Sequence, residues 1–228
     1  MENTCYSRVC AGRVKTFIDV GTNRGDWTQN ILDHGAECGW CFEPSSQCAS
    51  FLKSRFQGEN IKIRELALSD KQITQLFHEE PDFGMTSSLG IRSEHKSAQA
   101  REVTVTTLDD EFQNSDLVID FLKTDCEGWD LKVLQGGSLL LNRTNYIQFE
   151  YNSYWLKAGS SLREAIDFLE SLDFTVFLID GDSLRLFDYE FYGDFFRYSN
   201  FFACKKSDPH FSKLKLASEG GRIKLGGW

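Results

Sequence analysis

Short apolar segments alternate with helical patterns along most of the 228-residue chain, and this alternation constrains the fold more than any other feature. Segments rich in β-branched and aromatic residues predict buried strands, and the amphipathic segments between them predict helices. Strands joined by helices of about 10–15 residues form βαβ units, which build a mostly parallel sheet covered on both faces. We expect strands at residues 14–20, 38–43, 61–68, 72–78, 102–107, 117–124, 146–151, 174–179 and 200–204, and helices at 26–34, 45–56, 129–141 and 161–172.

The pattern indicates a single domain, because no repeat, low-complexity tract or linker interrupts it. We expect a lead-in at residues 1–13, the folded domain at 14–205 and a basic, solvated tail at 206–228. The apolar runs fall well short of the roughly 18–20 residues that span a bilayer. The first residues lack the positive charge and apolar stretch of a signal peptide, so we expect a cytoplasmic protein without a membrane span.

Acidic residues outnumber basic ones, with 34 Asp and Glu against 25 Lys and Arg, which gives a formal net charge of −9. Because the tail is basic, the excess of acid falls on the predicted domain. An acidic surface repels a phosphate backbone, so nucleic acid is not the partner we expect. The seven cysteines have no regular spacing and predict reduced thiols instead of a disulfide framework.

A glycine turn follows the first predicted strand and precedes the first helix. Gly21 and Gly25 let the backbone turn tightly and approach a ligand closely. Asn23 stands where the second glycine of a dinucleotide-binding G-x-G-x-x-G turn would admit a diphosphate. Asp19, two residues before Gly21, suits a cationic ligand better than an anionic one. S-adenosylmethionine fits this chemistry, because it carries a sulfonium and an ammonium group and no phosphate.

Acidic side chains also end several other predicted strands. Glu43 ends the second strand, 22 residues after Gly21, where a carboxylate can accept both hydroxyls of an adenosine ribose. Asp125 and Glu127 follow a later apolar strand, and Glu150 ends the next one. Three carboxylates on neighbouring strand ends repel one another unless a cation, shared protons or a positively charged ligand compensates. The alternative is that these acids are solvated strand ends without a ligand.

Six segments resemble, in the same order, the conserved stretches of FkbM-type S-adenosylmethionine-dependent methyltransferases: residues 17–25, 42–44, 67–70, 87–89, 120–129 and 147–150. The Leu-Lys-x-Asp-x-Glu-Gly stretch is the most specific of them, and the resemblance spans about residues 14–205. It implies an α/β class I (Rossmann-like) methyltransferase fold, with a mostly parallel seven-stranded sheet, helices on both faces and the last strand antiparallel. It also implies an O-methyltransferase that acts on a hydroxyl of a sugar, glycolipid or related small molecule.

The resemblance also implies roles for individual residues. The residues assigned to the cofactor are Asp19, Gly21, Asn23 and Gly25 at the methionine end, Glu43 at the ribose hydroxyls, Ser69 and Asp70 near the adenine, and Asp125 beside the methyl donor. Two positions depart from the family pattern, because Thr22 replaces the usual Ala and Cys126 replaces an aliphatic residue. Neither change removes a polar role.

An alcohol is a poor nucleophile at neutral pH, so a general base or a metal ion must help remove its proton. The candidates for either role are Asp125, Glu127 and Glu150, and a divalent cation is the second candidate cofactor. We favour Glu127 as the base, because a divalent ion needs a more complete oxygen shell. The alternative bases are His78 and His95, which lie in or beside a long polar loop at 79–101 that we expect to act as a lid with hinges at Gly84 and Gly90.

Two other functions compete with methyl transfer. A NAD-dependent oxidoreductase would share the role of Glu43, but Asn23 crowds the pyrophosphate position and no Tyr-Lys or His constellation is evident. A non-catalytic module that binds an adenosyl ligand would have less reason to keep every strand-end acid. The late aromatic residues, between 151 and 202, predict core and sheet-edge packing, or alternatively an acceptor pocket or self-association surface.

Overall fold

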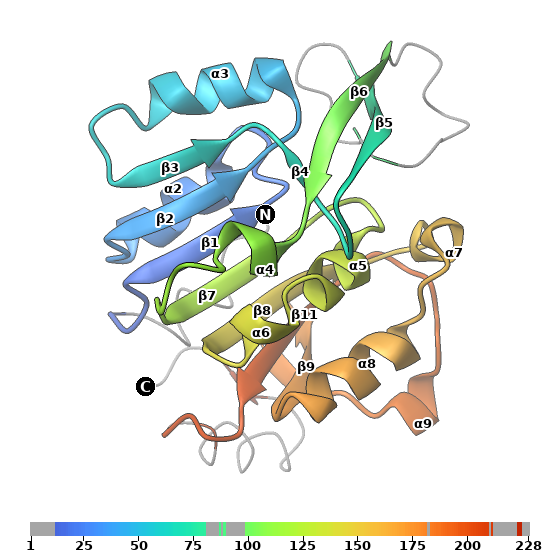
Figure 1. Cartoon of the computed structure of the whole chain (residues 1–228). Helices are drawn as coiled ribbons and strands as arrows, with labels where there is room; N and C mark the ends of the chain where they lie inside the picture. Colours follow the sequence, from blue (N-terminus) through green and yellow to red (C-terminus); the bar gives the residue numbers. More distant parts are fainter. Residues whose placement is uncertain are drawn as a thin grey trace.

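Two β-sheets organise the chain in the computed structural model, which describes residues 12–80, 87, 89, 99–181, 183–209, 211 and 223–224 (Figure 1). The larger sheet has nine strands in the order β12-β10-β9-β11-β8-β7-β1-β2-β3. The smaller sheet has three strands in the order β4-β6-β5.

The larger sheet contains the seven strands that the family resemblance implies. Five of them pair in parallel: β3 (Ile61–Arg64), β2 (Cys38–Phe42), β1 (Thr16–Val20), β7 (Ile119–Thr124) and β8 (Thr144–Tyr151). The sixth and seventh are β9 (Phe174–Asp180) and β11 (Ser199–Lys205), and β11 runs antiparallel to both β8 and β9. The expected mostly parallel sheet with an antiparallel last strand is therefore confirmed.

Two short strands extend this sheet beyond the expected seven. β10 (Ser183–Leu186) forms a hairpin with β9, and β12 (Ile223–Lys224) pairs antiparallel with β10. β12 falls in the segment that the sequence predicts to be a solvated tail, so this part of the tail returns to the sheet. The edge strand of a sheet has unpaired backbone N–H and C=O groups, and another strand can pair with them.

Helices cover both faces of the larger sheet, as the alternation of side chains along its strands requires (Figure 1). On one face Phe17 packs with Trp27 and Ile31 of α2 (Asp26–Asp33). On the opposite face Ile18 and Val20 belong to a larger apolar cluster. The helices on that face are α4 (Leu108–Glu111), α5 (Asp130–Gln135), α6 (Ser138–Leu141) and α8 (Leu162–Ser171).

Three further helices complete the described elements: α3 (Ser46–Arg55) beside β3, α7 (Trp155–Ala158) after β8, and α9 (Tyr189–Tyr192) before β11. Among the late aromatic residues, Tyr151, Trp155, Phe201 and Phe202 are buried in the core, whereas Phe191, Tyr192 and Tyr198 are exposed. No helix in the described part of the chain combines the length and the apolar composition that crossing a bilayer requires.

The expected helix at 129–141 is interrupted, and this corrects the sequence prediction. The chain forms α5 and then α6, separated by Gly136 and Gly137. A Cβ atom on Gly136 would overlap the backbone oxygen of Ser69. Only glycine therefore lets the chain between α5 and α6 approach the backbone at Ser69 this closely. The carbonyl of Gly136 also accepts a hydrogen bond of 2.9 Å from the Asp109 amide.

The expected strand at 61–68 also divides in two. β3 stays in the larger sheet, whereas β4 (Ala67–Leu68) pairs in parallel with β6 (Gln99–Thr106) of the smaller one. The third strand of the smaller sheet, β5 (Ile73–Glu79), forms an antiparallel hairpin with β6. The smaller sheet buries its own apolar cluster of Ala67, Phe77, Val103 and Val105.

The sequence predicts a loop at residues 79–101, but the first residue and the last three residues of this range belong to β5 and β6. Glu79 pairs with Gln99 in the register of these two strands, so both ends of that loop are strand. Ser87 and Leu89 are the described residues between them. The predicted hinges Gly84 and Gly90 and the alternative base His95 lie outside the described residues.

Candidate functional site

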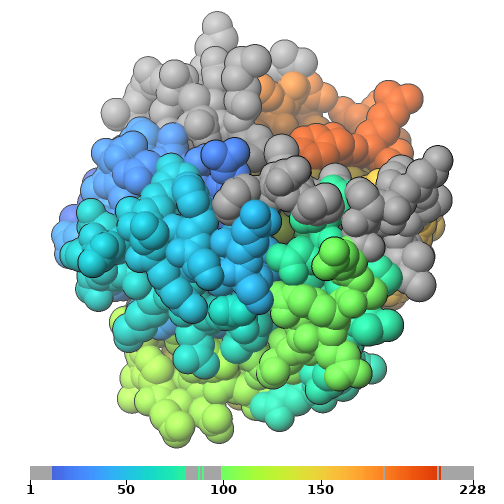
Figure 2. All heavy atoms as spheres, turned by 90° about the horizontal axis from the view of Figure 1, so that it is seen from above, coloured from blue at the N-terminus to red at the C-terminus, as the bar shows by residue number. Residues whose placement is uncertain are grey.

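A cavity of about 560 Å³ opens at the carboxyl ends of β1, β2, β7 and β8. The hairpin of the smaller sheet forms another part of its wall through Phe77, Glu80, Ser87 and Leu89. Seen from above, α3 and this hairpin lie side by side on the surface (Figure 2). Ligands of open parallel sheets bind at this edge, so the cavity is the candidate site.

The glycine turn after β1 brings two strand ends into direct contact. Gly21 has a φ angle of +73°, and a Cβ atom there would overlap the backbone oxygen of Asp125. The Asp125 amide donates to the carbonyl of Val20 over 3.0 Å. Asn23 also takes a left-handed conformation, with φ of 50°. The Gly21 and Thr22 amides both donate to the Phe42 carbonyl, over 3.0 and 3.3 Å, so the turn is fixed to the end of β2 beside the cavity.

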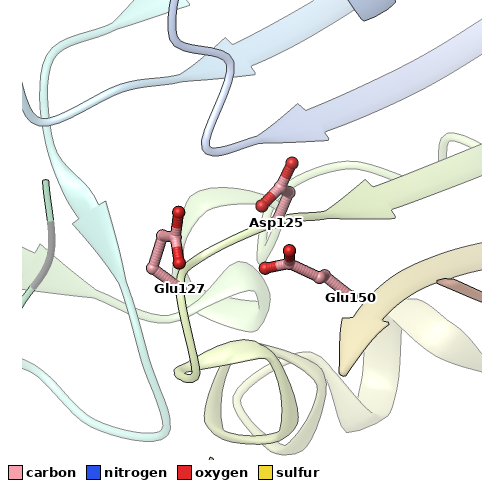
Figure 3. Close-up of side chains that lie close together, drawn as sticks. All are labelled: Asp125, Glu127 and Glu150. Carbon is pink, nitrogen blue, oxygen red and sulfur yellow. The ribbon is translucent and has the colours of Figure 1, made fainter. Parts of the chain in front are cut away.

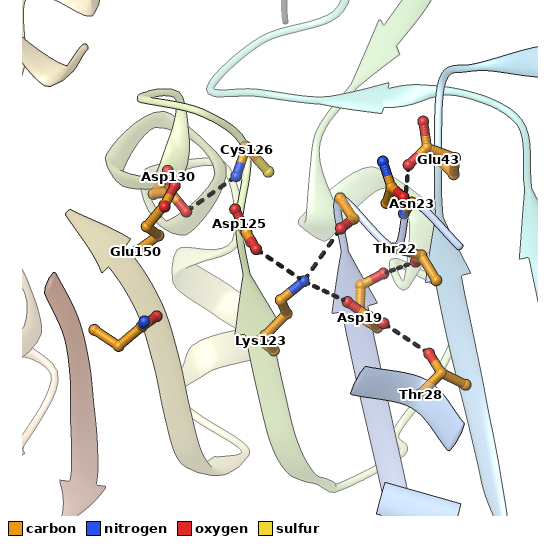
Figure 4. Close-up of polar contacts among 12 residues, drawn as sticks. Asp19, Thr22, Asn23, Thr28, Glu43, Lys123, Asp125, Cys126, Asp130 and Glu150 are labelled. Atoms are coloured by element: carbon orange, nitrogen blue, oxygen red, sulfur yellow. Dashed lines mark hydrogen bonds and ion pairs between the residues drawn. The ribbon is translucent and has the colours of Figure 1, made fainter. Parts of the chain in front are cut away.

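Glu43 lies at the end of β2 and is only 5% exposed. Its Oε2 accepts from the Asn23 amide over 2.7 Å (Figure 4). Its Oε1 accepts from the Ser45 amide over 2.9 Å. Burial raises the pKa of Glu43 to about 7, although these two amide hydrogen bonds lower it. Each carboxylate oxygen can accept a second hydrogen bond, so Glu43 retains capacity for ligand hydroxyls.

Lys123 occupies the centre of the site and joins β7 to β1 (Figure 4). Its Nζ donates to the Gly21 carbonyl over 3.1 Å and pairs with Asp19 Oδ1 at 3.1 Å and Asp125 Oδ2 at 3.5 Å. Burial disfavours its charged form, but the carboxylates of Asp19 and Asp125 outweigh that effect and raise the pKa of Lys123. Lys123 is therefore a buried cation held by two carboxylates.

Asp19 lies beneath the cavity and does not line it. The side chain is fully buried, and Oδ2 accepts from Thr28 Oγ1 over 2.7 Å. Asp19 and Lys123 are partners in the register of β1 and β7, on the face that α2 covers. The sequence predicts that Asp19 contacts the methionine end of the cofactor directly. In the structure Asp19 reaches the cavity only through its ion pair with Lys123.

Three other predicted cofactor residues are also outside the cavity wall. Gly25 lies against the side chains of Leu52 and Phe56. Ser69 is buried and donates to Asp70 Oδ1 over 3.1 Å, and Asp70 pairs with a lysine of α5. The predicted cofactor residues that line the cavity are Gly21, Asn23, Glu43 and Asp125.

The three predicted catalytic acids converge on the same part of the cavity (Figure 3). One carboxylate oxygen from each of Asp125, Glu127 and Glu150 lies within 4.8 Å of the others. Glu150 is 4% exposed, and its Oε2 accepts from Asn152 Nδ2 over 3.1 Å. Burial, followed by the charges of Asp125 and its acidic neighbours, raises the pKa of Glu150 to about 11. This shift favours the protonated form of Glu150 beside the charge of Asp125.

Glu127 reaches the cavity through a strained backbone. Its φ angle is 54°, in the left-handed region that residues other than Gly, Asn and Asp seldom adopt. Such strain persists where surrounding structure enforces it, and it concentrates at functional sites. The conformation points the Glu127 carboxylate toward Asp125 and Glu150 (Figure 3).

Asp130 adds a fourth buried acid behind the cluster. Its Oδ1 accepts from the Cys126 amide over 3.3 Å, whereas Oδ2 has no hydrogen-bond partner among the residues that the structure describes (Figure 4). Burial and then the charge of Asp125 raise the pKa of Asp130 to about 7. Neither Lys123 nor Asp130 is among the site residues predicted from the sequence. Lys123 could have been singled out from the sequence, because it is a charged residue within a largely apolar predicted strand.

A polar latch ties the hairpin to the end of β2. Arg101 Nε bonds to Glu79 Oε2 over 2.8 Å, and Arg101 Nη2 donates to the Pro44 carbonyl. Ser45 Oγ donates to Glu79 Oε1, while the Ser45 amide binds Glu43. The hairpin is thus connected to the residues beside Glu43. His78, the other alternative base, lies on β5 and does not line the cavity.

Comparisons with known proteins agree with this geometry. The model of the methyltransferase FkbM domain matches residues 19–176. The chain is 25% identical over 188 residues to the 2-O-methyltransferase NoeI of Sinorhizobium fredii, covering 74% of this chain and 77% of that protein.

Among solved structures, the chain is similar to the methyltransferase FkbM from Methylobacillus flagellatus KT, with 15% identity and a TM-score of 0.50. The match covers 88% of this chain and 48% of that one, so the chain spans about half the length of that protein. At this identity the likeness concerns the fold alone.

Proposed function

The chain belongs to the FkbM methyltransferase family, and from this premise we propose that it transfers a methyl group from S-adenosylmethionine to a hydroxyl of a sugar, glycolipid or related small molecule. One observation carries the proposal. A single cavity has the glycine turn and Glu43 on one part of its wall and the acids Asp125, Glu127 and Glu150 on another. Cofactor and acceptor would therefore meet inside one enclosed space.

The residues at the cofactor end fit S-adenosylmethionine. Gly21 takes the left-handed φ of the turn that lines the cavity, and Glu43 keeps acceptor capacity for the two ribose hydroxyls. Asn23 would line the methionine end, and Asp125 would face the positive charge of the donor. Ser69 and Asp70 near the adenine remain predictions, and Ala67 and Leu68, just before them, line the cavity.

The acids at the other end support removal of a proton from the acceptor. S-adenosylmethionine, when bound, supplies an electrophilic methyl group on a sulfonium. Glu127 would accept the proton of the acceptor hydroxyl as that oxygen takes the methyl group, and S-adenosylhomocysteine would be the leaving group. Glu150, whose raised pKa favours its protonated form, would donate a hydrogen bond to the acceptor and hold it in line.

A divalent cation is the other way to compensate the three carboxylates, because one oxygen of each lies within 4.8 Å of the others. A bound cation would polarise the acceptor hydroxyl, and Glu127 would then act as a ligand instead of a base. The two mechanisms differ in their response to a chelator.

The family match favours methyl transfer over a NAD-dependent oxidoreductase. Calorimetric titration with S-adenosylhomocysteine and with NAD separates these functions, and we expect binding of the first only. Transfer of a tritiated methyl group to fractionated sugar and glycolipid acceptors, with and without EDTA, then tests catalysis and cation dependence.

Asp125→Asn is the matched control for that assay. We expect the variant to lose turnover, because the site loses the charge that faces the donor. Full activity of Asp125→Asn would refute this assignment of the site. Binding of S-adenosylhomocysteine without transfer to any acceptor would instead support a non-catalytic binding module.

A further inference from the structure

We propose that Lys123 is a positioning residue for the cofactor, which holds the Gly21 turn and the Asp125 carboxylate in the arrangement that binds the methionine end of S-adenosylmethionine. This inference rests on the proposed function. It concerns a residue that lies between the glycine turn and the acid cluster and belongs to neither.

The three contacts of the ammonium group define the role. Nζ lies 3.1 Å from the Gly21 carbonyl, 3.1 Å from Asp19 Oδ1 and 3.5 Å from Asp125 Oδ2. The contact with the Gly21 carbonyl is a hydrogen bond, and the contacts with the two carboxylates are ion pairs. Lys123 is 6% exposed, and it therefore acts on a ligand through Gly21 and Asp125.

The contacts join two strand ends that already touch. The Gly21 turn leaves no space for a Cβ atom against the Asp125 backbone, and the Asp125 amide binds the Val20 carbonyl. The Lys123 side chain adds a second link, from β7 to the Gly21 carbonyl. Fixing that carbonyl fixes the peptide plane it shares with Thr22, whose amide donates to the Phe42 carbonyl over 3.3 Å.

The charges of the unit also favour a cationic ligand. Asp19 and Asp125 carry two negative charges and Lys123 carries one positive charge, so the unit has one net negative charge. Asp19 is fully buried, whereas the Asp125 side chain is 30% exposed and lines the cavity. The net charge is therefore presented by Asp125, where the sulfonium and ammonium of the cofactor would lie.

Folding alone gives little reason to keep such a unit. A buried ion pair is often no more stabilising than apolar residues of similar volume, because both charges lose their hydration. The neighbouring positions Phe17 and Phe121, on the same face of β1 and β7, are apolar. The polar pair interrupts this apolar face at its end, directly under the cavity.

The test compares two ligands that differ only at the methionine end. S-adenosylhomocysteine carries the amino-acid group, and 5′-methylthioadenosine lacks it but keeps the adenine and ribose. Removing Lys123 alone would leave Asp19 buried without a counter-ion, so the main variant is the double substitution Asp19→Asn, Lys123→Met. It removes both charges together, and the asparagine can still accept from Thr28.

A second variant, Lys123→Arg, keeps the charge but not the geometry, because a planar guanidinium cannot reproduce the three contacts of an ammonium. The matched control is Lys205→Met. Lys205 is another buried strand lysine, 7% exposed, whose Nζ donates to the Leu172 carbonyl over 2.6 Å, outside the cavity.

We expect calorimetry on the full chain to show at least about a tenfold loss of affinity for S-adenosylhomocysteine in both Lys123 variants. Affinity for 5′-methylthioadenosine should stay within about twofold of the wild-type value, and Lys205→Met should bind both ligands normally. Unchanged S-adenosylhomocysteine affinity, or an equal loss for both ligands in a folded variant, would overturn the role of Lys123. If the wild-type chain binds neither ligand, the proposed cofactor fails, and this inference fails with it.

Discussion

At the residue scale, the candidate base Glu127 combines a strained backbone with a charged neighbourhood. Its φ of 54° costs about 1–2 kcal/mol for a side chain of this type. The carboxylate also lies close to those of Asp125 and Glu150. Both features oppose folding, so the role we assign to Glu127 predicts that stability and activity trade against each other at this position.

Glu127→Gly tests this relation. We expect the free energy of unfolding to rise by about 0.5–1 kcal/mol, because glycine accepts the left-handed conformation and repulsion is relieved. Turnover should fall by about 100-fold or more, since the proton acceptor is lost. Urea unfolding and initial rates measure the two effects, and Glu127→Gln should show the loss of turnover with only the part of the stability gain that comes from relieved repulsion.

Glu150 leads to a different expectation, because the protonated acid and glutamine are close isosteres. Burial and then the charge of Asp125 raise its pKa to about 11. We expect Glu150→Gln to retain kcat within about tenfold of wild type, far above the corresponding Glu127 variant. Steady-state kinetics at pH 7.5 decides this, and equal losses at the two positions would show that Glu150 also works as a carboxylate.

At the element scale, the sequence predicts the order and type of most strands because their apolar runs are distinct. It misses the two interruptions, at 65–66 and at 136–137, because tertiary contacts cause them. The strand-end acids were predictable from the strand boundaries alone. The contact of Lys123 with Asp19 depends on the register between β1 and β7. A register is a property of two paired strands, so it cannot be read from the sequence of either strand alone.

Gly136→Ala tests the interruption between α5 and α6. A Cβ atom at this position would overlap the Ser69 carbonyl, and a backbone oxygen has little freedom to move away. We expect a loss of about 1–3 kcal/mol in the free energy of unfolding, although alanine is the better helix former. Gln135→Ala is the control, because Gln135 is exposed at the neighbouring position of α5 and its substitution adds no new Cβ atom. A Gly136→Ala variant as stable as wild type would contradict the packing reason for the break.

At the scale of the whole molecule, burial of acids makes stability depend on pH. Burial raises the pKa of Glu43 and of Asp130 to about 7 in the folded chain. Both groups bind more protons when folded than when unfolded, so their contribution to stability is complete below their ordinary pKa values near 4. It is lost as the pH rises through about 7.

Asp130→Asn isolates one of these groups. We expect the variant to gain stability relative to wild type by roughly 1–3 kcal/mol at pH 8, and little or nothing at pH 4. Urea unfolding of both proteins across this range gives the difference directly. A stability difference that does not change with pH would mean that Asp130 titrates normally.

The hairpin of the smaller sheet leaves and rejoins the body of the molecule at one place, because Ile73 at its start pairs with Val105 near its end. An excursion with adjacent ends can change in length or sequence with little effect on the strands that carry Glu43 and Asp125, provided that Glu79 and Arg101 keep their contacts with Ser45 and Pro44. It also supplies Phe77 and Glu80 to the cavity wall. Such an arrangement is modular: exchanging the segment between residues 73 and 105 among relatives is a route to new acceptor preferences on an unchanged catalytic body.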